Sequence, residues 1–250
     1  MGFASRLTAF PCLLSFLTRI PGRCHDVRRA AYAFPLAPLV GLVEGLLLSL
    51  LASMMHCSPR ITGALLLVAH LMLTGGIHME GFADYSDAVG AGARGNRALE
   101  LLKDPRRGGF AVIFTAVLVI AKYAGYASLA EKPLALLSPY VASTEAMYIA
   151  SIILPSANAE GLGMLFKKLG AVGDGVMVNI VAFALSSLTV VWLLPQDSLI
   201  ALSTGVLAGL LAAIDALKRI GRVSGDALGF VYEVSNTASI LGVAAHGCAS

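Results

Sequence analysis

The chain has 250 residues, of which 57% are hydrophobic and only 13% are charged, and its mean hydropathy is +0.80. An average soluble domain carries about 25% charged residues, so this composition excludes an ordinary soluble protein and indicates an integral membrane protein. The formal net charge of +3 favours anionic substrates or lipids over nucleic acid, because the basic residues are not interleaved with aromatic ones.

Seven apolar stretches are long enough to cross a hydrocarbon core of about 30 Å as helices. Helices are expected because lipid cannot satisfy exposed backbone polar groups. The opening apolar run, which Pro11 interrupts, is expected to form a short interfacial or re-entrant helix. The sequence thus predicts an all-α fold: a polytopic membrane helix bundle with about seven transmembrane helices plus short cytoplasmic and interfacial helices, in one domain over 1–250. The predicted spans are 33–55, 61–77, 109–129, 134–153, 175–194, 198–216 and 228–246.

The basic residues alternate along these spans. If the N-terminus is cytoplasmic, fifteen of the eighteen Lys and Arg residues lie in inside segments, whereas Arg60 and Lys132 lie outside and Lys122 falls within a span. This asymmetry follows the positive-inside rule. We therefore expect an integral protein of the plasma (cytoplasmic) membrane, with its N-terminus and active site cytoplasmic and its C-terminus outside.

Cysteine and glycine spacings indicate structural roles. The cysteines show no C-x-x-C spacing and no disulfide framework, so they are interpreted as small apolar residues; they are Cys12, Cys24, Cys57 and Cys248. Glycine pairs at small-xxx-small spacing predict close helix packing; they are Gly41 with Gly45 and Gly205 with Gly209.

Three carboxylates gather in the stretch "TGGIHMEGFADYSDAVG", residues 74–90. Glu80, Asp84 and Asp87 stand at i, i+4 and i+7, so a helix would present them on one face. At mid-bilayer each would cost roughly 2.5–3.5 kcal/mol, so we expect them at the cytoplasmic rim, lining water, or on a cation. Mg²⁺ takes oxygen ligands and bridges carboxylates to substrate phosphates. The alternative is helix capping and solvated polarity, since acidic residues favour helix N-termini.

Glycines surround these acids. Gly75, Gly76 and Gly81 are expected to let a bulky anion approach the backbone. A later segment, "GRVSGDALG", repeats the pattern of glycines around an acid with Gly225 and Asp226. Both segments are predicted to lie on the cytoplasmic side.

The segment "RALELLKDPRRGG" predicts a short cytoplasmic helix that ends at Pro105 and Gly108. It would bring Asp104, Arg106 and Arg107 to the same side of the membrane. Arginine is suited to bidentate recognition of phosphate. The alternative is positive charge that only orients the neighbouring span.

Four motifs in order, "GGIHMEGFADYSDA", "LLKDPRRGG", "EGLG" at 160–163 and "GRVSGDALG", resemble the cobalamin synthase family, also called adenosylcobinamide-GDP ribazoletransferases. The segments "FLTRIPG" and "RAAYAFPL" are similar to its N-terminal pattern, so the resemblance runs from about residue 16 to residue 233. It implies a polytopic, Mg²⁺-dependent membrane enzyme. Such an enzyme joins a GDP-activated corrinoid to α-ribazole, or to its 5′-phosphate, and releases GMP. A homo-oligomer or a complex with other cobalamin-assembly enzymes is also expected.

The resemblance, together with the needs of an attack by an alcohol on a diphosphate, gives the expected site residues. Asp87 is the first choice for the base, and Arg106 for a phosphate clamp. The expected catalytic residues are Asp87, His78, Asp104 and Arg106; the expected substrate-binding residues are Gly75, Gly76, Gly81, Arg107, Gly225, Arg19 and Arg29; and the expected metal ligands are Glu80, Asp84, Asp87 and Asp226.

The chain departs from the family pattern at five positions. Glu80 stands where Asp is usual, which keeps the charge but lengthens the side chain by one methylene. The resemblance therefore implies a divergent member. The other departures are Pro38 and Ala88 where Gly is common, Pro105 for Ser, and Ser224 for Thr.

Two other functions fit part of the pattern. A phosphotransferase of the phospholipid synthase type would also place carboxylates on one helix face, but its D-G-x-x-A-R start is absent. A proton-coupled transporter is suggested by Glu44, Lys122 and Glu145 within predicted spans. These three residues are scattered, which favours buried pairing or positions at helix ends.

Overall fold

The structure is a computed structural model that describes residues 3–22, 24–104, 106, 108–156 and 159–249. The described residues form helices joined by turns and contain no strand, so the predicted all-α class is confirmed. The elements in chain order are α1 (Phe3–Leu17), α2 (Val27–Tyr32), η1 (Phe34–Leu36), α3 (Ala37–Met54), α4 (Pro59–Thr74), α5 (Ile77–Gly90), α6 (Gly95–Lys103), α7 (Gly109–Ser128), η2 (Pro133–Leu136), α8 (Leu137–Ile153), α9 (Gly161–Ala171), α10 (Gly175–Leu193), α11 (Pro195–Arg219) and α12 (Gly225–Ala249).

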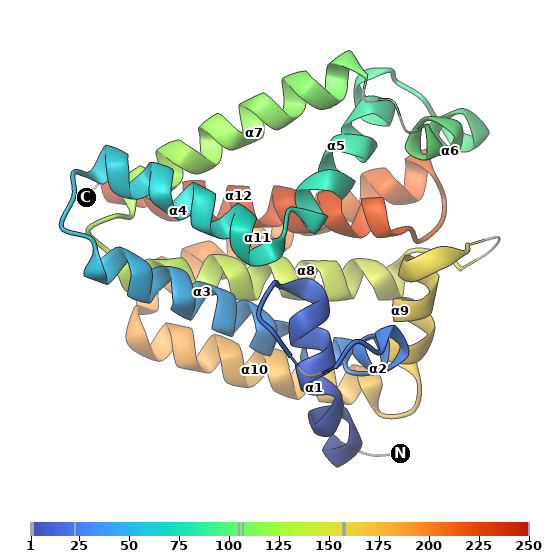
Figure 1. The fold of residues 1–250 in the computed structure, drawn as a ribbon, viewed down its shortest axis with the longest axis horizontal. Coiled ribbons are helices and arrows are strands. Elements are labelled where there is room, and N and C mark those ends of the chain that lie inside the picture. The colour runs from blue at the N-terminus through green and yellow to red at the C-terminus, as the bar shows by residue number, and fades with distance from the viewer. Residues whose placement is uncertain (1–2, 23, 105, 107, 157–158, 250) are drawn as a thin grey trace.

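The long helices lie side by side, α6 and α9 lie at one end, and α1 and α2 lie along the lower edge of the bundle in this view (Figure 1). The turn between α3 and α4 and the C-terminus lie at the opposite end from α6 and α9. Helix α1 runs at a steep angle to α3 in this view, so it does not lie alongside the long helices.

Five helical segments of the described chain are long and apolar enough to cross a membrane: Phe34–Met54, Gly109–Ser128, Pro133–Ile153, Gly175–Leu193 and Pro195–Arg219. They confirm five of the seven predicted spans. The predicted span 61–77 falls mainly in α4, which with 16 residues is too short alone and qualifies only together with α5, as a span broken by a 94° bend. The last predicted span falls in α12, which is not among the qualifying helices; Glu233 and Asn236 make it more polar.

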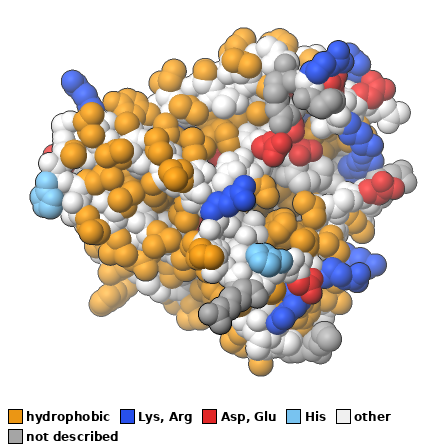
Figure 2. Space-filling model, viewed as in Figure 1, with side chains coloured by type: hydrophobic (Ala, Val, Ile, Leu, Met, Phe, Trp, Pro, Cys, Tyr) orange, Lys and Arg blue, Asp and Glu red, His pale blue; other side chains and the backbone are white. Residues whose placement is uncertain are grey.

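Large apolar side chains cover the outside of these helices. Ile120 on α7 is 66% exposed and Trp192 on α10 is 83% exposed. Figure 2 shows hydrophobic side chains over most of this face, with charged ones gathered toward the side of α6 and α9. A surface of this kind suits lipid, since water would make such a large exposed apolar area unfavourable. The chain is therefore an integral membrane protein.

Two glycines make the bend between α4 and α5. Gly75 has φ +62° and Gly76 has φ +71°, a left-handed conformation that glycine adopts without steric cost. Helix α4 ends at Thr74, and α5 begins directly after Gly76. The two glycines turn α5 across the bundle, and their binding of an anion stays a prediction.

Helix α12 lies at the centre of the bundle and packs against α5, α7, α8 and α11. It crosses α5 at two glycines: a Cβ at Gly81 would lie 3.0 Å from Asp226 Cα, and a Cβ at Gly229 would lie 2.9 Å from the His78 carbonyl oxygen. The predicted glycine pairs also lie at helix contacts, the first against α8 and the second against Ala142 and Ala146 of α8 and Ser239 and Ser235 of α12.

The ionisable residues inside the spans are paired. Lys122 of α7 forms a buried ion pair with Glu233 of α12 and donates a hydrogen bond to Asn236 at 2.9 Å. Glu44 accepts a hydrogen bond from the Tyr232 hydroxyl at 2.7 Å. Glu145 likewise accepts one from the Asn179 amide at 3.0 Å. This confirms the expected buried pairing.

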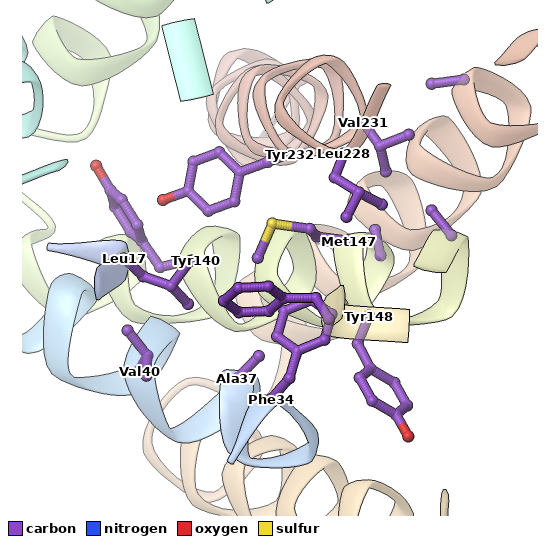
Figure 3. Packing of buried hydrophobic residues seen from close by; sticks show 14 of the residues in the cluster. Leu17, Phe34, Ala37, Val40, Tyr140, Met147, Tyr148, Leu228, Val231 and Tyr232 are labelled. Atoms are coloured by element: carbon purple, nitrogen blue, oxygen red, sulfur yellow. The ribbon is translucent and has the colours of Figure 1, made fainter. Parts of the chain in front are cut away.

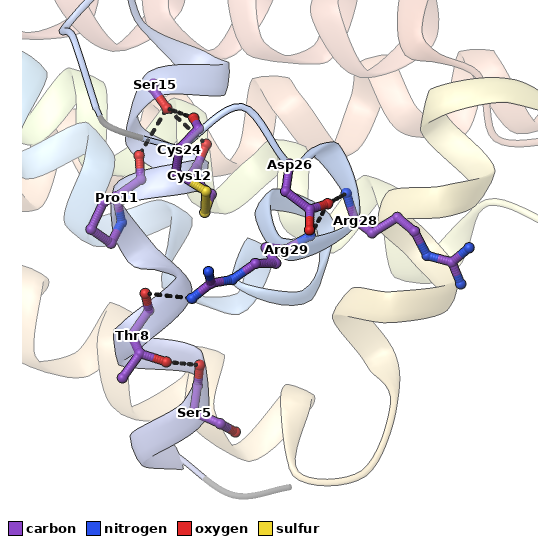
Figure 4. The surroundings of a disulfide bond; sticks show 9 residues. All are labelled: Ser5, Thr8, Pro11, Cys12, Ser15, Cys24, Asp26, Arg28 and Arg29. Atoms are coloured by element: carbon purple, nitrogen blue, oxygen red, sulfur yellow. Dashed lines mark hydrogen bonds between the residues drawn. A yellow bond between two sulfur atoms is a disulfide. The ribbon is translucent and has the colours of Figure 1, made fainter.

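One cysteine interpretation was wrong. Cys12 of α1 and Cys24 form a disulfide, with Cα atoms 4.9 Å apart, because the chain reverses after α1 (Figure 4). The Ser15 hydroxyl bridges the reversal by donating to the Cys24 carbonyl oxygen at 2.9 Å. Cys57 is a free, exposed cysteine in the turn after α3. The disulfide fixes α1 against the segment that leads into α2.

The α5–α12 crossing predicts a sharp sensitivity to added volume. Replacing Gly229 by Ala should lower the free energy of unfolding by about 1–3 kcal/mol, because the new methyl group would push against the α5 backbone. The measurement is the thermal unfolding midpoint of the purified protein in detergent. Gly109→Ala is the control, since a Cβ there meets nothing within 4 Å. Equal midpoints for Gly229→Ala and the wild type would show that the helices do not touch here.

Candidate functional site

Helix α5 and the start of α12 line one cavity with a volume of about 380 Å³. Its polar lining consists of Glu80 and Asp84 from α5 and Asp226 from α12, with His78 beside them. These are three of the four predicted metal ligands and one predicted catalytic residue. The structure therefore brings together acids that lie more than a hundred positions apart in the sequence.

A second cavity of about 710 Å³ adjoins the first, because both are lined by Leu162, Gly225 and Asp226. Lys103 and Arg222 place positive charge on the lining of the second cavity. A Cβ at Gly225 would meet no atom within 4 Å, so the backbone at this junction is open to a ligand. Substrate binding at Gly225 stays a prediction.

Asp87 lies apart from this site. Its two carboxylate oxygens accept hydrogen bonds from the backbone N–H groups of Gly108, at 2.7 Å, and Ala111, at 2.8 Å. These amides belong to the first turn of α7, where a negative charge is favourable. The carboxylate lines a separate, smaller cavity and not the one around Asp84. The geometry therefore gives Asp87 the capping role that the sequence left open as an alternative.

Asp104 and Arg106 line the same smaller cavity as Asp87. Arg106 donates two side-chain hydrogen bonds to the Asp104 carboxylate, at 3.0 and 2.8 Å. These bonds and one from the Arg106 backbone N–H lower the pKa of Asp104 to about 2. This pairing uses two of the five N–H donors of the Arg106 guanidinium. Arg107, predicted beside it, lies outside the described residues.

The two predicted N-terminal arginines also lie outside the lining of the two main cavities. The Arg19 side chain lies against Gly75, and its backbone N–H donates to the Leu73 carbonyl oxygen at 2.6 Å. Arg29 is exposed and donates to the Thr8 carbonyl oxygen at 3.2 Å (Figure 4). Both contacts link α1 or its following segment to neighbouring parts of the chain.

His78 is buried, and its ring stacks on Tyr232 with 3.9 Å between the ring centroids. The Tyr232 hydroxyl is in turn fixed by its hydrogen bond to Glu44. Among the described residues, no side chain or backbone group forms a hydrogen bond with His78 Nε2. A buried nitrogen of this kind is able to accept or donate a proton when a ligand fills the cavity.

The acids of the first cavity offer only oxygen ligands, which suits a hard cation such as Mg²⁺. In the part of the chain that the structure describes, no three His, Cys, Asp or Glu side chains converge closely enough to enclose an ion by themselves. Magnesium sites often need no such cage, because the ion keeps several waters and binds through one or two carboxylates together with substrate phosphates. The residues fit an ion that binds with its substrate, and the metal itself stays a prediction.

Sequence reasoning missed the residues that complete the walls of these cavities. Arg222 and Lys103 were counted only as inside positive charge, although both lie in the quoted motifs. Glu160 begins the "EGLG" motif and lines the second cavity. All three residues lie within the quoted motifs, so the motifs were the signal in the sequence that could have identified them.

Comparison with known proteins supports the motif resemblance. The model of a family described as cobalamin-5-phosphate synthase matches residues 9–244. A Stutzerimonas stutzeri protein named adenosylcobinamide-GDP ribazoletransferase is 31% identical over 238 residues, covering 92% of this chain and 95% of the relative. Relatives of the same name from Pseudomonas fluorescens and Acetivibrio thermocellus are 32% and 31% identical, covering 94% and 90% of this chain and 97% and 92% of their own. No solved structure matches the chain.

The contacts of Asp87 predict a structural effect. Asp87→Ala removes the acceptors for the first amides of α7 and should lower the free energy of unfolding by about 1–2 kcal/mol. The thermal unfolding midpoint in detergent measures this. Glu100→Ala on α6 is the matched control, because Glu100 forms a solvent-exposed ion pair with Arg97 that contributes little. An unchanged midpoint for Asp87→Ala would return Asp87 to the candidates for the base.

Proposed function

The chain belongs to the cobalamin-5-phosphate synthase family, and on this premise we propose that it is a membrane transferase that joins adenosylcobinamide-GDP to α-ribazole or its 5′-phosphate and releases GMP. The observation that carries the proposal is the cavity in which Glu80, Asp84 and Asp226 meet. The names of the relatives support the reaction class.

The reaction is a substitution at phosphorus. The acceptor's ribose hydroxyl oxygen forms a bond to the phosphorus that carries the corrinoid, the bond from that phosphorus to the bridging oxygen breaks, and GMP leaves with the electron pair. The hydroxyl proton passes to a base. A site for this step must neutralise the diphosphate, align the two substrates and exclude competing water.

Three carboxylates would bind the diphosphate only through a cation. We place Mg²⁺ in the cavity lined by Glu80, Asp84 and Asp226, where it would bind one or two of these carboxylates together with the substrate phosphates and offset the charge of both. Asp226 stands at the junction of the two cavities, so the reacting phosphorus belongs beside it. Lys103 and Arg222 in the second cavity would then hold the phosphate of the leaving nucleotide.

We assign the base to His78 in place of Asp87. His78 lines the cavity that holds the other acids, whereas both Asp87 oxygens already accept backbone hydrogen bonds. The stack on Tyr232 holds the imidazole ring in one orientation. Its Nε2 forms no hydrogen bond with the described residues, so it is available to accept the hydroxyl proton.

The activity test compares conservative variants by GMP release from GDP-activated cobinamide and α-ribazole with Mg²⁺. Asp84→Asn keeps the shape but removes a charge, and turnover should fall at least about a hundredfold, as for the loss of a contact to transition-state charge. Glu80→Asp keeps the charge and should stay within about tenfold of the wild type. Turnover should also stop in excess chelator and return with Mg²⁺.

The control is Asp87→Asn, which changes an acid of the same helix outside the cavity. Near wild-type turnover by Asp84→Asn, or full turnover in chelator, would contradict the proposed site. Normal insertion and elution on gel filtration establish that each variant is folded.

The proposed orientation predicts which thiols a membrane-impermeant maleimide reaches from outside the cell. Cys57 lies in the turn after α3, at the end of the bundle opposite α6 (Figure 1). In a Cys248→Ser background we expect Cys57 to label in intact cells. Asn96→Cys on α6, made with Cys57→Ser, should label only after the membrane is opened. Labelling of Asn96→Cys in intact cells would put the site on the wrong side for a GDP-activated substrate.

A further inference from the structure

The first cavity is polar only on the side of its acids. The opposite wall is apolar and includes three phenylalanines from three separate elements: Phe16 from α1, Phe34 from η1 and Phe166 from α9. Their rings contact one another, with centroids 4.7 Å apart for Phe16 and Phe166 and 5.0 Å apart for Phe34 and Phe166. We call this wall, Phe16, Phe34 and Phe166, the aromatic wall.

Neighbouring residues hold the aromatic wall in place. Phe34 is only 1% exposed and also packs against Tyr148 of α8. Met147, from the same helix, lies between Phe34 and helix α12 (Figure 3). Phe16 follows Cys12 by one helical turn, so the disulfide fixes the helix that carries it. The wall is therefore built from packed side chains that neighbouring helices support.

The two cavities differ in the chemistry of their linings, so they suit different substrates. Phosphates and a guanine base need hydrogen-bond donors and positive charge, which the second cavity offers through Lys103 and Arg222. The aromatic wall offers ring faces and edges but no hydrogen-bonding group. Flat aromatic molecules pack well on such rings in stacked or edge-to-face geometry. A cavity of about 380 Å³ is within the range of about 300–1,000 Å³ typical of small-molecule sites.

We propose that the aromatic wall binds the flat, uncharged base of the acceptor nucleoside and determines which bases the enzyme accepts. This inference rests on the proposed function, because it concerns the acceptor of that reaction. With the base on the wall, the attached ribose points toward the acids on the opposite side of the same cavity. The attacking hydroxyl then lies near Asp226, at the junction with the cavity proposed for the leaving nucleotide.

The test measures binding and turnover separately, with protein in lipid nanodiscs. Equilibrium dialysis with radiolabelled benzimidazole riboside, without donor or Mg²⁺, should show about tenfold weaker binding to Phe166→Leu than to the wild type, the effect expected for the loss of one aromatic contact. In the GMP assay the same variant should raise the KM for the riboside about tenfold. Its KM for the GDP-activated corrinoid and its kcat should change less than about threefold.

Two further variants keep the test decisive. Phe16→Leu, at the most exposed ring of the wall, should give the same pattern if Phe166→Leu does not fold. Phe183→Leu is the matched control, because Phe183 on α10 packs against a separate apolar cluster and does not line the cavity. It should leave both the binding constant and the two KM values unchanged.

The outcomes distinguish the inference from the proposed function. Unchanged riboside binding and KM in Phe166→Leu and Phe16→Leu, with GMP still released, would overturn the aromatic wall and leave the reaction standing. If the wild type releases no GMP but binds the riboside in a way that depends on Phe166, the proposed reaction is overturned and the wall remains a site for aromatic bases. A raised KM for the corrinoid donor in place of the riboside would also overturn the inference.

Discussion

The site depends on one close contact between backbones, the crossing of α5 and α12 at Gly81 and Gly229. A side chain at either position would separate the helices. Because the helices touch, the first turn of α12 lies against the middle of α5, and Asp226 reaches the cavity that Glu80 and Asp84 line. The bend at Gly75 and Gly76 supports this arrangement, since a straight continuation of α4 would carry α5 away from the crossing. Glycines therefore set the helix geometry on which the cavity depends.

The buried polar groups of the bundle hold α12 at the position that the crossing needs. The ion pair between Lys122 and Glu233 joins α7 to α12, and the hydrogen bond between Tyr232 and Glu44 joins α12 to α3. Removing one partner from a buried pair typically costs about 3–5 kcal/mol, because the other charge is left uncompensated. The same segment of α12 carries the ring that stacks on His78. The ionisable residues that suggested transport thus connect the membrane-spanning core to the site.

The sequence predicted the helical class, five spans and the cluster of acids, because apolar length and helical spacing are local properties. It also placed Glu80 and Asp84 on one face, which the shared cavity confirms. Spacing alone put Asp87 on that face too, but the first amides of α7 bind its carboxylate, and no sequence pattern showed that α7 would begin there. The Cys12–Cys24 bond and the aromatic wall were missed for the same reason. Each depends on where the chain turns in space.

Cross-linking across the cavity in membranes is the most direct test that the crossing assembles the site. The experiment uses the double variant Asp84→Cys and Asp226→Cys in a background that carries Cys57→Ser and Cys248→Ser. A short bifunctional thiol reagent is added, and the chain is then cleaved at a protease site inserted between α8 and α9. The two fragments should stay joined, whereas those of the Asp87→Cys and Asp226→Cys pair should separate. The crossing would be contradicted if only the fragments of the Asp87→Cys and Asp226→Cys pair stayed joined, or if the fragments of both pairs separated.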